Sequence, residues 1–229
     1  MRRINARLPQ AVIFDLDGTL VDSAADIGAS LNWLLSGIGR RAVVRAEVVT
    51  WVGDGVAKLV ERGLEATGGV PAADELAALV ARFTDHYEAH SAELTRPFSG
   101  VVAALEKLAA AGCRLGVCTN KPEGATWEIL ETLGLGHFFQ AVAGGDTVPG
   151  VRKPQPEHVL HVVQELGVPP AAAVMVGDSP NDINAAKAAN LRAVAVSFGY
   201  TRVPPAELGA DALIDHFDEL VAALEKLAV

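Results

Sequence analysis

The feature that most constrains the fold is a set of short apolar runs separated by helical patterns. Four runs have the length and composition of buried strands, and two weaker runs follow the same rule. Strands that alternate with helices predict an α/β fold with a doubly wound parallel sheet. The predicted strands are residues 11–14, 114–118, 173–176 and 193–196, with 141–143 and 212–214 weaker, and the predicted helices are 100–111, 157–166, 181–189 and 217–227.

One long segment interrupts this alternation. Between about residues 23 and 94 the apolar side chains recur at helical spacing, and we find no strand pattern. About 70 residues are too many for an ordinary crossover between parallel strands. We therefore predict a core domain formed by residues 1–21 and 97–229, and an inserted α-helical domain formed by residues 22–96.

Charge and composition exclude several classes of partner. The net charge of −9 argues against a protein that coats nucleic acid, because phosphate backbones require clustered Lys and Arg. No run approaches the length of a membrane helix, and the N-terminus lacks the pattern of a signal peptide, so we expect no membrane partner and a cytoplasmic location. We expect Cys113 and Cys118 to be reduced core thiols and Trp33, Trp51 and Trp127 to serve packing in the core or in the inserted helices. We expect no metal site at His158 and His161.

The strongest chemical signal directly follows the first predicted strand. Asp15 and Asp17 are separated by one residue, so both carboxylates can project from the same end of the sheet. Two close carboxylates cannot both stay ionised unless a cation lies between them or one takes a proton. Gly18 permits a tight turn close to a ligand. This segment therefore predicts a cation site or a general acid.

Three further segments carry polar residues after strands or between turns. Thr119 and Asn120 end a strand and can hold an anionic oxygen, although such residues also commonly cap helices. Lys153 lies beside two prolines that stiffen the backbone. Asp178 and Asp182 repeat the design of the first segment, with a buried strand followed by acids in a tight loop.

The predicted topology brings these segments together. In an open parallel sheet, ligands bind outside the carboxyl ends of the strands, at the point where the strand order reverses. If the chain runs outward from the first strand and then returns to its other side, Asp15, Asp17 and Asp178 meet at that point. A divalent cation is the simplest explanation for so many carboxylates in one place.

Together these segments resemble the haloacid dehalogenase superfamily, over nearly the whole chain. The resemblance implies a magnesium-dependent phosphatase with Asp15 as nucleophile and Asp17 as general acid and base. It implies that Thr119 and Asn120 bind phosphate and that Lys153 steadies the developing charge. Asp178 matches the metal-binding acid and Asp182 its support, and Mg²⁺ would also take the Asp15 carboxylate and the Asp17 carbonyl oxygen.

The residue at position 17 separates branches of the superfamily. Dehalogenase relatives carry a tyrosine there and phosphonate-cleaving relatives an alanine, so the aspartate implies a phosphatase or a phosphomutase. The inserted helices match the superfamily's cap, which implies a small phosphorylated metabolite as substrate. The oligomeric state stays open between monomer and homodimer.

Within the predicted cap, residues 50–56 resemble the specificity loop of phosphoglycolate phosphatases. Gly53 and Gly55 would let backbone N–H groups approach a small substrate, and the following helix start could meet a carboxylate. Lys58 or Arg62 could supply a positive charge, or they could be ordinary surface residues.

Several functions remain open at this point. The first is hydrolysis of 2-phosphoglycolate. The alternatives are hydrolysis of a sugar phosphate such as an amino-sugar 6-phosphate, hydrolysis of pyrophosphate, and a sugar phosphomutase reaction. A further alternative is that the protein is not an enzyme but a non-catalytic binding module with the same fold.

Overall fold

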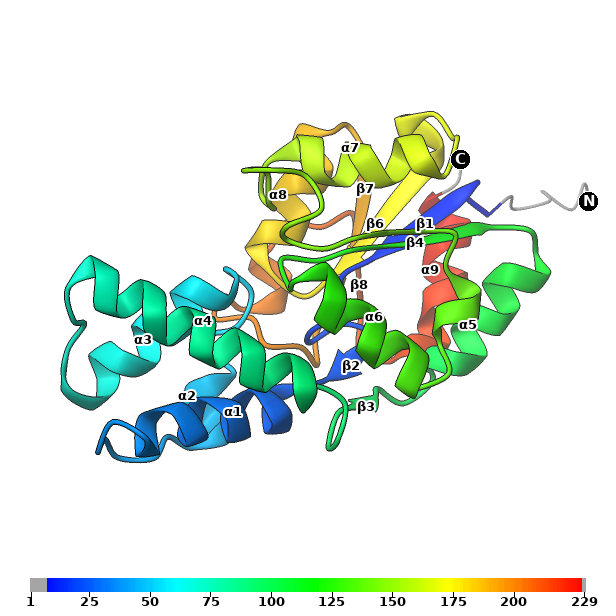
Figure 1. Cartoon of the computed structure of the whole chain (residues 1–229). Helices are drawn as coiled ribbons and strands as arrows, with labels where there is room; N and C mark the ends of the chain where they lie inside the picture. Colours follow the sequence, from blue (N-terminus) through cyan, green and yellow to red (C-terminus); the bar gives the residue numbers. More distant parts are fainter. Residues whose placement is uncertain (1–7, 228–229) are drawn as a thin grey trace, which may run out of the picture.

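The computed structural model describes residues 8–227 and contains a six-stranded parallel sheet in the order β5-β4-β1-β6-β7-β8 (Figure 1). All six predicted strands are present, to within one residue at each end, and the predicted doubly wound α/β fold is confirmed. The strands are β1 (Ala11–Phe14), β4 (Arg114–Cys118), β5 (Ala141–Ala143), β6 (Ala173–Gly177), β7 (Arg192–Val196) and β8 (Ala212–Ile214).

The strand order reverses at β1, as the sequence predicts. β1 pairs with β4 on one side and with β6 on the other, both in parallel. The chain runs outward through β4 to β5, then returns to the far side of β1 and continues through β6, β7 and β8. The carboxyl ends of β1, β4 and β6 therefore lie side by side, where a ligand site is expected.

Helices cover both faces of the sheet because each central strand is apolar on both sides. In β1, Val12 and Phe14 belong to one buried cluster, whereas Ala11 and Ile13 belong to the other. The first cluster includes α5 (Val101–Ala110) and α9 (Leu220–Leu227), and the second includes α7 (Pro156–Glu165) and α8 (Pro180–Ala188). Single 3₁₀ turns occur at Gly136–Phe138, Pro170–Ala172, Pro205–Glu207 and Phe217–Glu219.

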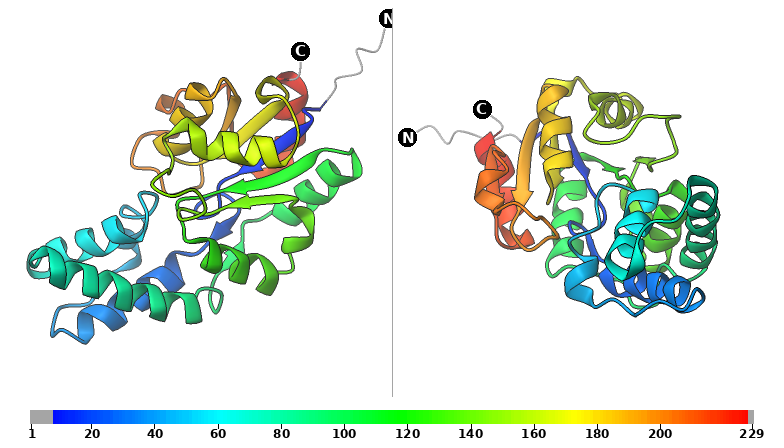
Figure 2. Two further views of the ribbon diagram at one scale, coloured as in Figure 1. Left: turned by 45° about the horizontal axis from the view of Figure 1, so that its top comes forward. Right: turned by 90° about the vertical axis from the view of Figure 1, so that its left-hand side faces the viewer.

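The inserted segment forms a separate group of helices at one end of the sheet (Figure 2). These are α1 (Ala24–Ser36), α2 (Arg45–Val48), α3 (Val56–Gly68) and α4 (Ala73–Ala89), and they enclose an apolar cluster to which the sheet domain contributes Ala125. The segment begins at β2 (Val21–Asp22) and ends at β3 (Arg96–Pro97), which pair in antiparallel fashion. The chain thus enters and leaves the helical group through adjacent strands.

Some features differ from the sequence-based expectations or were not predicted. Helix α6 (Glu123–Thr132) was not predicted from the sequence, and α2 is too short to show a helical pattern of apolar residues. Trp33 packs within the inserted helices by stacking on the ring of His86, with 4.1 Å between ring centroids, and is 44% exposed. Both cysteines are buried and unpaired, as expected.

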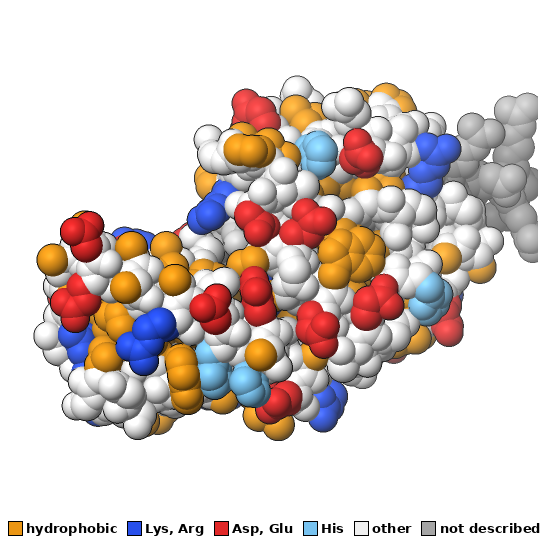
Figure 3. Space-filling view, viewed as in Figure 1, with side chains coloured by type: hydrophobic (Ala, Val, Ile, Leu, Met, Phe, Trp, Pro, Cys, Tyr) orange, Lys and Arg blue, Asp and Glu red, His pale blue; other side chains and the backbone are white. Residues whose placement is uncertain are grey.

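The surface agrees with the acidic composition. Acidic side chains are spread over the face seen in Figure 3, on both the helical group and the sheet domain, and basic side chains there are fewer. Among residues 8–227, no helix is both long and apolar enough to cross a bilayer.

Candidate active site

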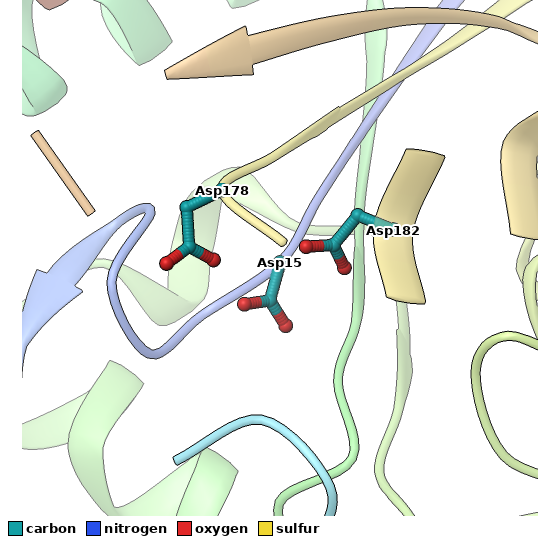
Figure 4. A group of neighbouring side chains, drawn as sticks. All are labelled: Asp15, Asp178 and Asp182. Atoms are coloured by element: carbon teal, nitrogen blue, oxygen red, sulfur yellow. The ribbon is translucent and has the colours of Figure 1, made fainter. Parts of the chain in front are cut away.

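Three buried carboxylates meet at the carboxyl ends of β1 and β6 (Figure 4). Asp15 directly follows β1, Asp178 directly follows β6, and Asp182 lies in the first turn of α8. One oxygen from each lies within 4.8 Å of the others. The residues come from two distant parts of the sequence, and the strand order inferred from that sequence brings them together.

Glycines make this close approach possible. Gly18 has φ +88°, and a Cβ atom there would lie 2.5 Å from Oδ2 of Asp178. A Cβ atom at Gly199 would also overlap Asp178, and one at Gly177 would overlap Asp182. The backbone around the acids is therefore packed so tightly that side chains are excluded.

Lys153 lies between two of the acids. Its Nζ donates to Oδ1 of Asp15 and to Oδ1 of Asp182, each at 2.6 Å. The side chain of Asn120 holds the lysine backbone on both sides, accepting from Lys153 N at 2.9 Å and donating to Lys153 O at 3.0 Å. Asp182 is held in turn by the backbone N–H and hydroxyl of Ser179, at 3.0 and 2.7 Å. Lys153 thus has a fixed position beside the Asp15 carboxylate.

The acids carry more negative charge than Lys153 can neutralise. Burial raises the pKa of Asp15 to about 7 despite the opposing effect of Lys153. Burial raises the pKa of Asp178 as well, and the charges of Asp182 and Asp15 add to the effect. Burial alone would lower the pKa of Lys153, but the two carboxylates beside it outweigh burial and raise that pKa. A further cation at this place would favour the ionised acids.

The oxygen atoms available at the cluster fit a divalent cation. In Asp182, both carboxylate oxygens accept hydrogen bonds from Lys153 or Ser179. In Asp15 and Asp178, Oδ1 of the first and Oδ2 of the second are engaged, by Lys153 and by the backbone N–H of Tyr200. Among the described contacts, one oxygen of Asp15 and one of Asp178 remain without a donor, and carboxylate oxygens are the ligands that Mg²⁺ prefers.

Asp17 lies outside this cluster and faces a different cation. Its carboxylate accepts hydrogen bonds from the Ser23 hydroxyl at 2.5 Å and from Nζ of Lys121 at 2.8 and 2.7 Å. Lys121 Nζ also lies 4.7 Å from the centroid of the Tyr87 ring. The sequence pattern indicates no role for Lys121, although the residue directly follows Asn120 in one of the four polar segments.

Tyr200 is a second residue that the sequence did not reveal. Its hydroxyl accepts from the backbone N–H groups of Ser23 and Ala24, at 2.9 and 3.1 Å, and donates to Asp22 at 2.6 Å. Its own N–H donates to Asp178 at 2.5 Å. Tyr200 therefore connects the acid cluster to the point where the chain enters the helical group.

Thr119 and part of the loop 50–56 line the same cavity as Asp15 and Asp182. Thr119 directly follows β4 and is 2% exposed. Gly53 and Gly55 lie across the cavity with φ +113° and +89°. The carbonyl oxygen of Gly53 accepts hydrogen bonds from the side chains of Asn120 and Asn181, at 2.9 and 3.2 Å. The loop is thus attached to the sheet domain in this conformation.

Lys58 and Arg62 do not supply charge to this cavity. Lys58 pairs with Glu61 on the same helix at 2.7 Å, and its side chain is 46% exposed. Arg62 donates to the carbonyl oxygen of Trp51 at 2.8 Å and pairs with Asp54. Among the described residues that line the cavity, Lys121 and Lys153 are the positively charged ones.

The half of the cavity formed by the inserted helices is mainly apolar. Its lining from that side comprises Ile27, Val52, Val56, Leu59 and Phe83, together with Tyr87 and the glycines of the loop. The opposite half, from the sheet domain, carries three acids and two lysines, namely Asp15, Asp17, Asp182, Lys121 and Lys153. The cavity therefore combines a charged floor with an apolar wall.

Comparisons with known proteins agree with this arrangement. Residues 12–196 match the family model of haloacid dehalogenase-like hydrolases. The chain is 42% identical to a phosphoglycolate phosphatase of Agrobacterium fabrum, over 96% of this chain and 94% of that protein. The crystal structure of a predicted phosphoglycolate phosphatase from Haemophilus somnus aligns with a TM-score of 0.88 at 30% identity, covering 96% of this chain and 98% of that one. A mutant of CbbY from Rhodobacter sphaeroides, solved with xylulose-1,5-bisphosphate, aligns with a TM-score of 0.79 at 30% identity, covering 95% and 99%.

Proposed function

Because the chain belongs to the haloacid dehalogenase-like hydrolase family, we propose that it is a phosphatase that hydrolyses 2-phosphoglycolate to glycolate and phosphate. The observation that carries the proposal is the Asp15 carboxylate, which lies beside Lys153 on one side and Asp178 on the other, at the floor of a cavity. The 42% identical relative named for this activity supports the substrate.

In the first step, one carboxylate oxygen of Asp15 attacks phosphorus while the bond between phosphorus and the ester oxygen breaks. A carboxylate is a poor nucleophile toward a phosphate dianion, because like charges repel. Lys153 lowers this repulsion from a fixed position 2.6 Å from Asp15, and the Thr119 hydroxyl holds a phosphoryl oxygen. Asp17 gives a proton to the departing ester oxygen, so glycolate leaves as a neutral alcohol at that end.

In the second step, water attacks the phosphorus of the aspartyl-phosphate and the bond to Asp15 breaks. Asp17 takes the proton from that water, so both residues return to their starting states. We propose that Asp15, Asp178 and the backbone carbonyl of Asp17 hold Mg²⁺, with Asp182 in support. When bound, the ion would neutralise charge on the phosphoryl oxygens during displacement.

We propose that residues 22–96 form a cap domain that opens for the substrate and closes over it. Two short strands, β2 and β3, connect this region to the core, and the Gly53 carbonyl is held by two core side chains. Gly53 and Gly55 would let backbone N–H groups approach the substrate. A closed cap excludes water from the reaction and limits the substrate to a small metabolite.

The second candidate is hydrolysis of a sugar phosphate, which the similarity to CbbY supports. The apolar wall of Ile27, Val56 and Leu59 argues against it. Each sugar hydroxyl placed against that wall would lose hydrogen bonds to water without gaining one from the protein. A two-carbon acid has no hydroxyl to satisfy there.

A panel of substrates tests this function. Turnover with Mg²⁺ would be measured for 2-phosphoglycolate, an amino-sugar 6-phosphate, xylulose-1,5-bisphosphate and pyrophosphate. We expect kcat/KM to be highest for 2-phosphoglycolate. A higher value for either sugar phosphate would overturn the substrate, and an isomerised sugar phosphate without free phosphate would indicate a mutase. If no substrate releases phosphate, the proposed phosphatase activity is wrong and a non-catalytic binding module is favoured.

A further inference from the structure

We propose that Lys121 and Tyr87 form the subsite that binds the carboxylate of the substrate. This inference rests on the proposed function, because it names the residues that would recognise the acidic end of 2-phosphoglycolate. Lys121 comes from the sheet domain and Tyr87 from α4 of the inserted helices, so the subsite spans the two regions. Both side chains line the cavity that contains Asp15.

The first observation is an ammonium donor that remains free. An ammonium group has three N–H donors. Two of those of Lys121 reach the oxygens of Asp17, and the described residues offer the third no oxygen or nitrogen acceptor, only the face of the Tyr87 ring at 4.7 Å. The Lys121 side chain is 3% exposed, so water cannot easily satisfy that donor. A buried cation with a free donor in a cavity fits an anionic ligand group.

The second observation is a buried hydroxyl without a partner. Tyr87 is 2% exposed, and its hydroxyl has no hydrogen-bond partner among the described residues. Such a group costs free energy unless a ligand or water accepts its hydrogen bond. The Tyr87 ring faces the Lys121 ammonium, so both donors belong to one corner of the cavity.

The geometry of the substrate fits this corner. In 2-phosphoglycolate one methylene carbon separates the ester oxygen from the carboxylate. If Asp17 faces the ester oxygen, the carboxylate must lie near a group that contacts Asp17, and Lys121 is such a group. Lys153 is unavailable for this contact because Asp15 and Asp182 hold it. Lys58 and Arg62 are engaged outside the cavity.

The proposal is tested with two substrates that differ at one group. Ethyl phosphate carries a methyl group where 2-phosphoglycolate carries its carboxylate. The measured quantity is the specificity ratio, defined as kcat/KM for 2-phosphoglycolate divided by kcat/KM for ethyl phosphate. We expect Lys121→Met to lower this ratio about 10- to 100-fold, the value of a charged hydrogen bond, and Tyr87→Phe about 3- to 10-fold. Lys121→Arg, which keeps the charge, should lower it less than Lys121→Met.

Lys58→Met is the matched control, because it removes a lysine charge from the inserted helices outside the cavity. Its specificity ratio should equal that of the wild type. If Lys121→Met and Tyr87→Phe lower kcat/KM for both substrates equally, the ratio is unchanged and the carboxylate subsite is refuted. If Lys121→Met does not fold, Tyr87→Phe decides the question alone.

Failure of the proposed function would look different. A wild-type ratio near one would show that the enzyme does not recognise the carboxylate at all, and would overturn both the substrate and the subsite. A wild-type ratio far above one that survives both substitutions would leave the substrate standing and overturn only the subsite. The same variants in an Asp15→Asn background, titrated with each ester, would measure binding without turnover, and the ratio of dissociation constants should change in the same direction.

Discussion

The two halves of the cavity differ in how they are built and in what they reveal. The half from the sheet domain is charged and is held by hydrogen bonds from Lys153 to Asp15 and Asp182. The half from the inserted helices is apolar apart from Tyr87 and the loop glycines. The charged half would perform a reaction common to the family, whereas the apolar half would select the substrate. On this account a few charged residues carry out the reaction, and the shape of the apolar lining selects the substrate.

The largest expected effect comes from removing the nucleophile in the charged half. Asp15→Asn should lower kcat by about 10⁴-fold or more, because an amide cannot form the covalent intermediate. The thermal unfolding temperature should not fall, since the change keeps the shape of the side chain. Asp218→Asn, at an exposed position, is the matched control and should be fully active. Near-wild-type turnover by Asp15→Asn would refute the assignment.

A second effect concerns how the stability of the metal-free protein depends on pH through the Asp15 carboxyl in the charged half. The folded-state pKa of Asp15 is raised from 3.8 to about 7, so the folded state holds the proton more tightly than the unfolded state. Its contribution to stability is complete below about pH 4 and is lost as the pH rises through about 7. In the presence of a chelator, wild type should therefore lose about 1 to 3 kcal/mol relative to Asp15→Asn between about pH 4 and pH 8.

Urea unfolding of both proteins across this pH range measures that difference. Added Mg²⁺ should reduce the loss for the wild type, because a cation favours the ionised acids. A constant difference between the two proteins at all pH values would show that Asp15 has an ordinary pKa. The apolar half should contribute nothing to this pH dependence.

The smallest expected effect comes from a substitution in the loop 50–56, which belongs to the apolar half of the cavity. Gly55 has φ +89°, and a Cβ atom there would lie 3.1 Å from Nη1 of Arg152. Gly55→Ala should cost about 1 kcal/mol of stability and lower kcat/KM several-fold, because the strained loop shifts against the substrate. Gly39→Ala is the matched control, with φ +71° and open space around it. Gly39→Ala should lose similar stability but keep its kcat/KM, and an equal kinetic loss in both variants would contradict the role of the loop.

The sequence predicted the charged half well, for a physical reason. Each acid follows a short apolar run, and parallel strands place their carboxyl ends along one edge of the sheet. Once the order around β1 was inferred, the convergence of Asp15 and Asp178 followed. All six strands were predicted to within one residue at each end, because short apolar runs that alternate with helical patterns are typical of buried parallel strands.

The apolar half could not be predicted in the same way. Tyr87 belongs to an apolar stripe of α4, and nothing in that stripe indicates that its ring lies over Lys121, which is 34 positions further along the chain. Tyr200 connects to Asp178 and Ser23 only through the fold. The pair β2 and β3 has two residues in each strand, too few to form a pattern. Such contacts depend on how the helices sit on the core, which local sequence does not specify.

The stereochemical course at phosphorus tests the central claim most directly. The claim is that Asp15 accepts the phosphoryl group before water does. The substrate would be 2-phosphoglycolate made chiral at phosphorus with oxygen isotopes and sulfur, and the configuration of the released thiophosphate would be determined. Two successive in-line displacements predict net retention of configuration. Net inversion would mean that water attacks the substrate directly and would contradict the role of Asp15.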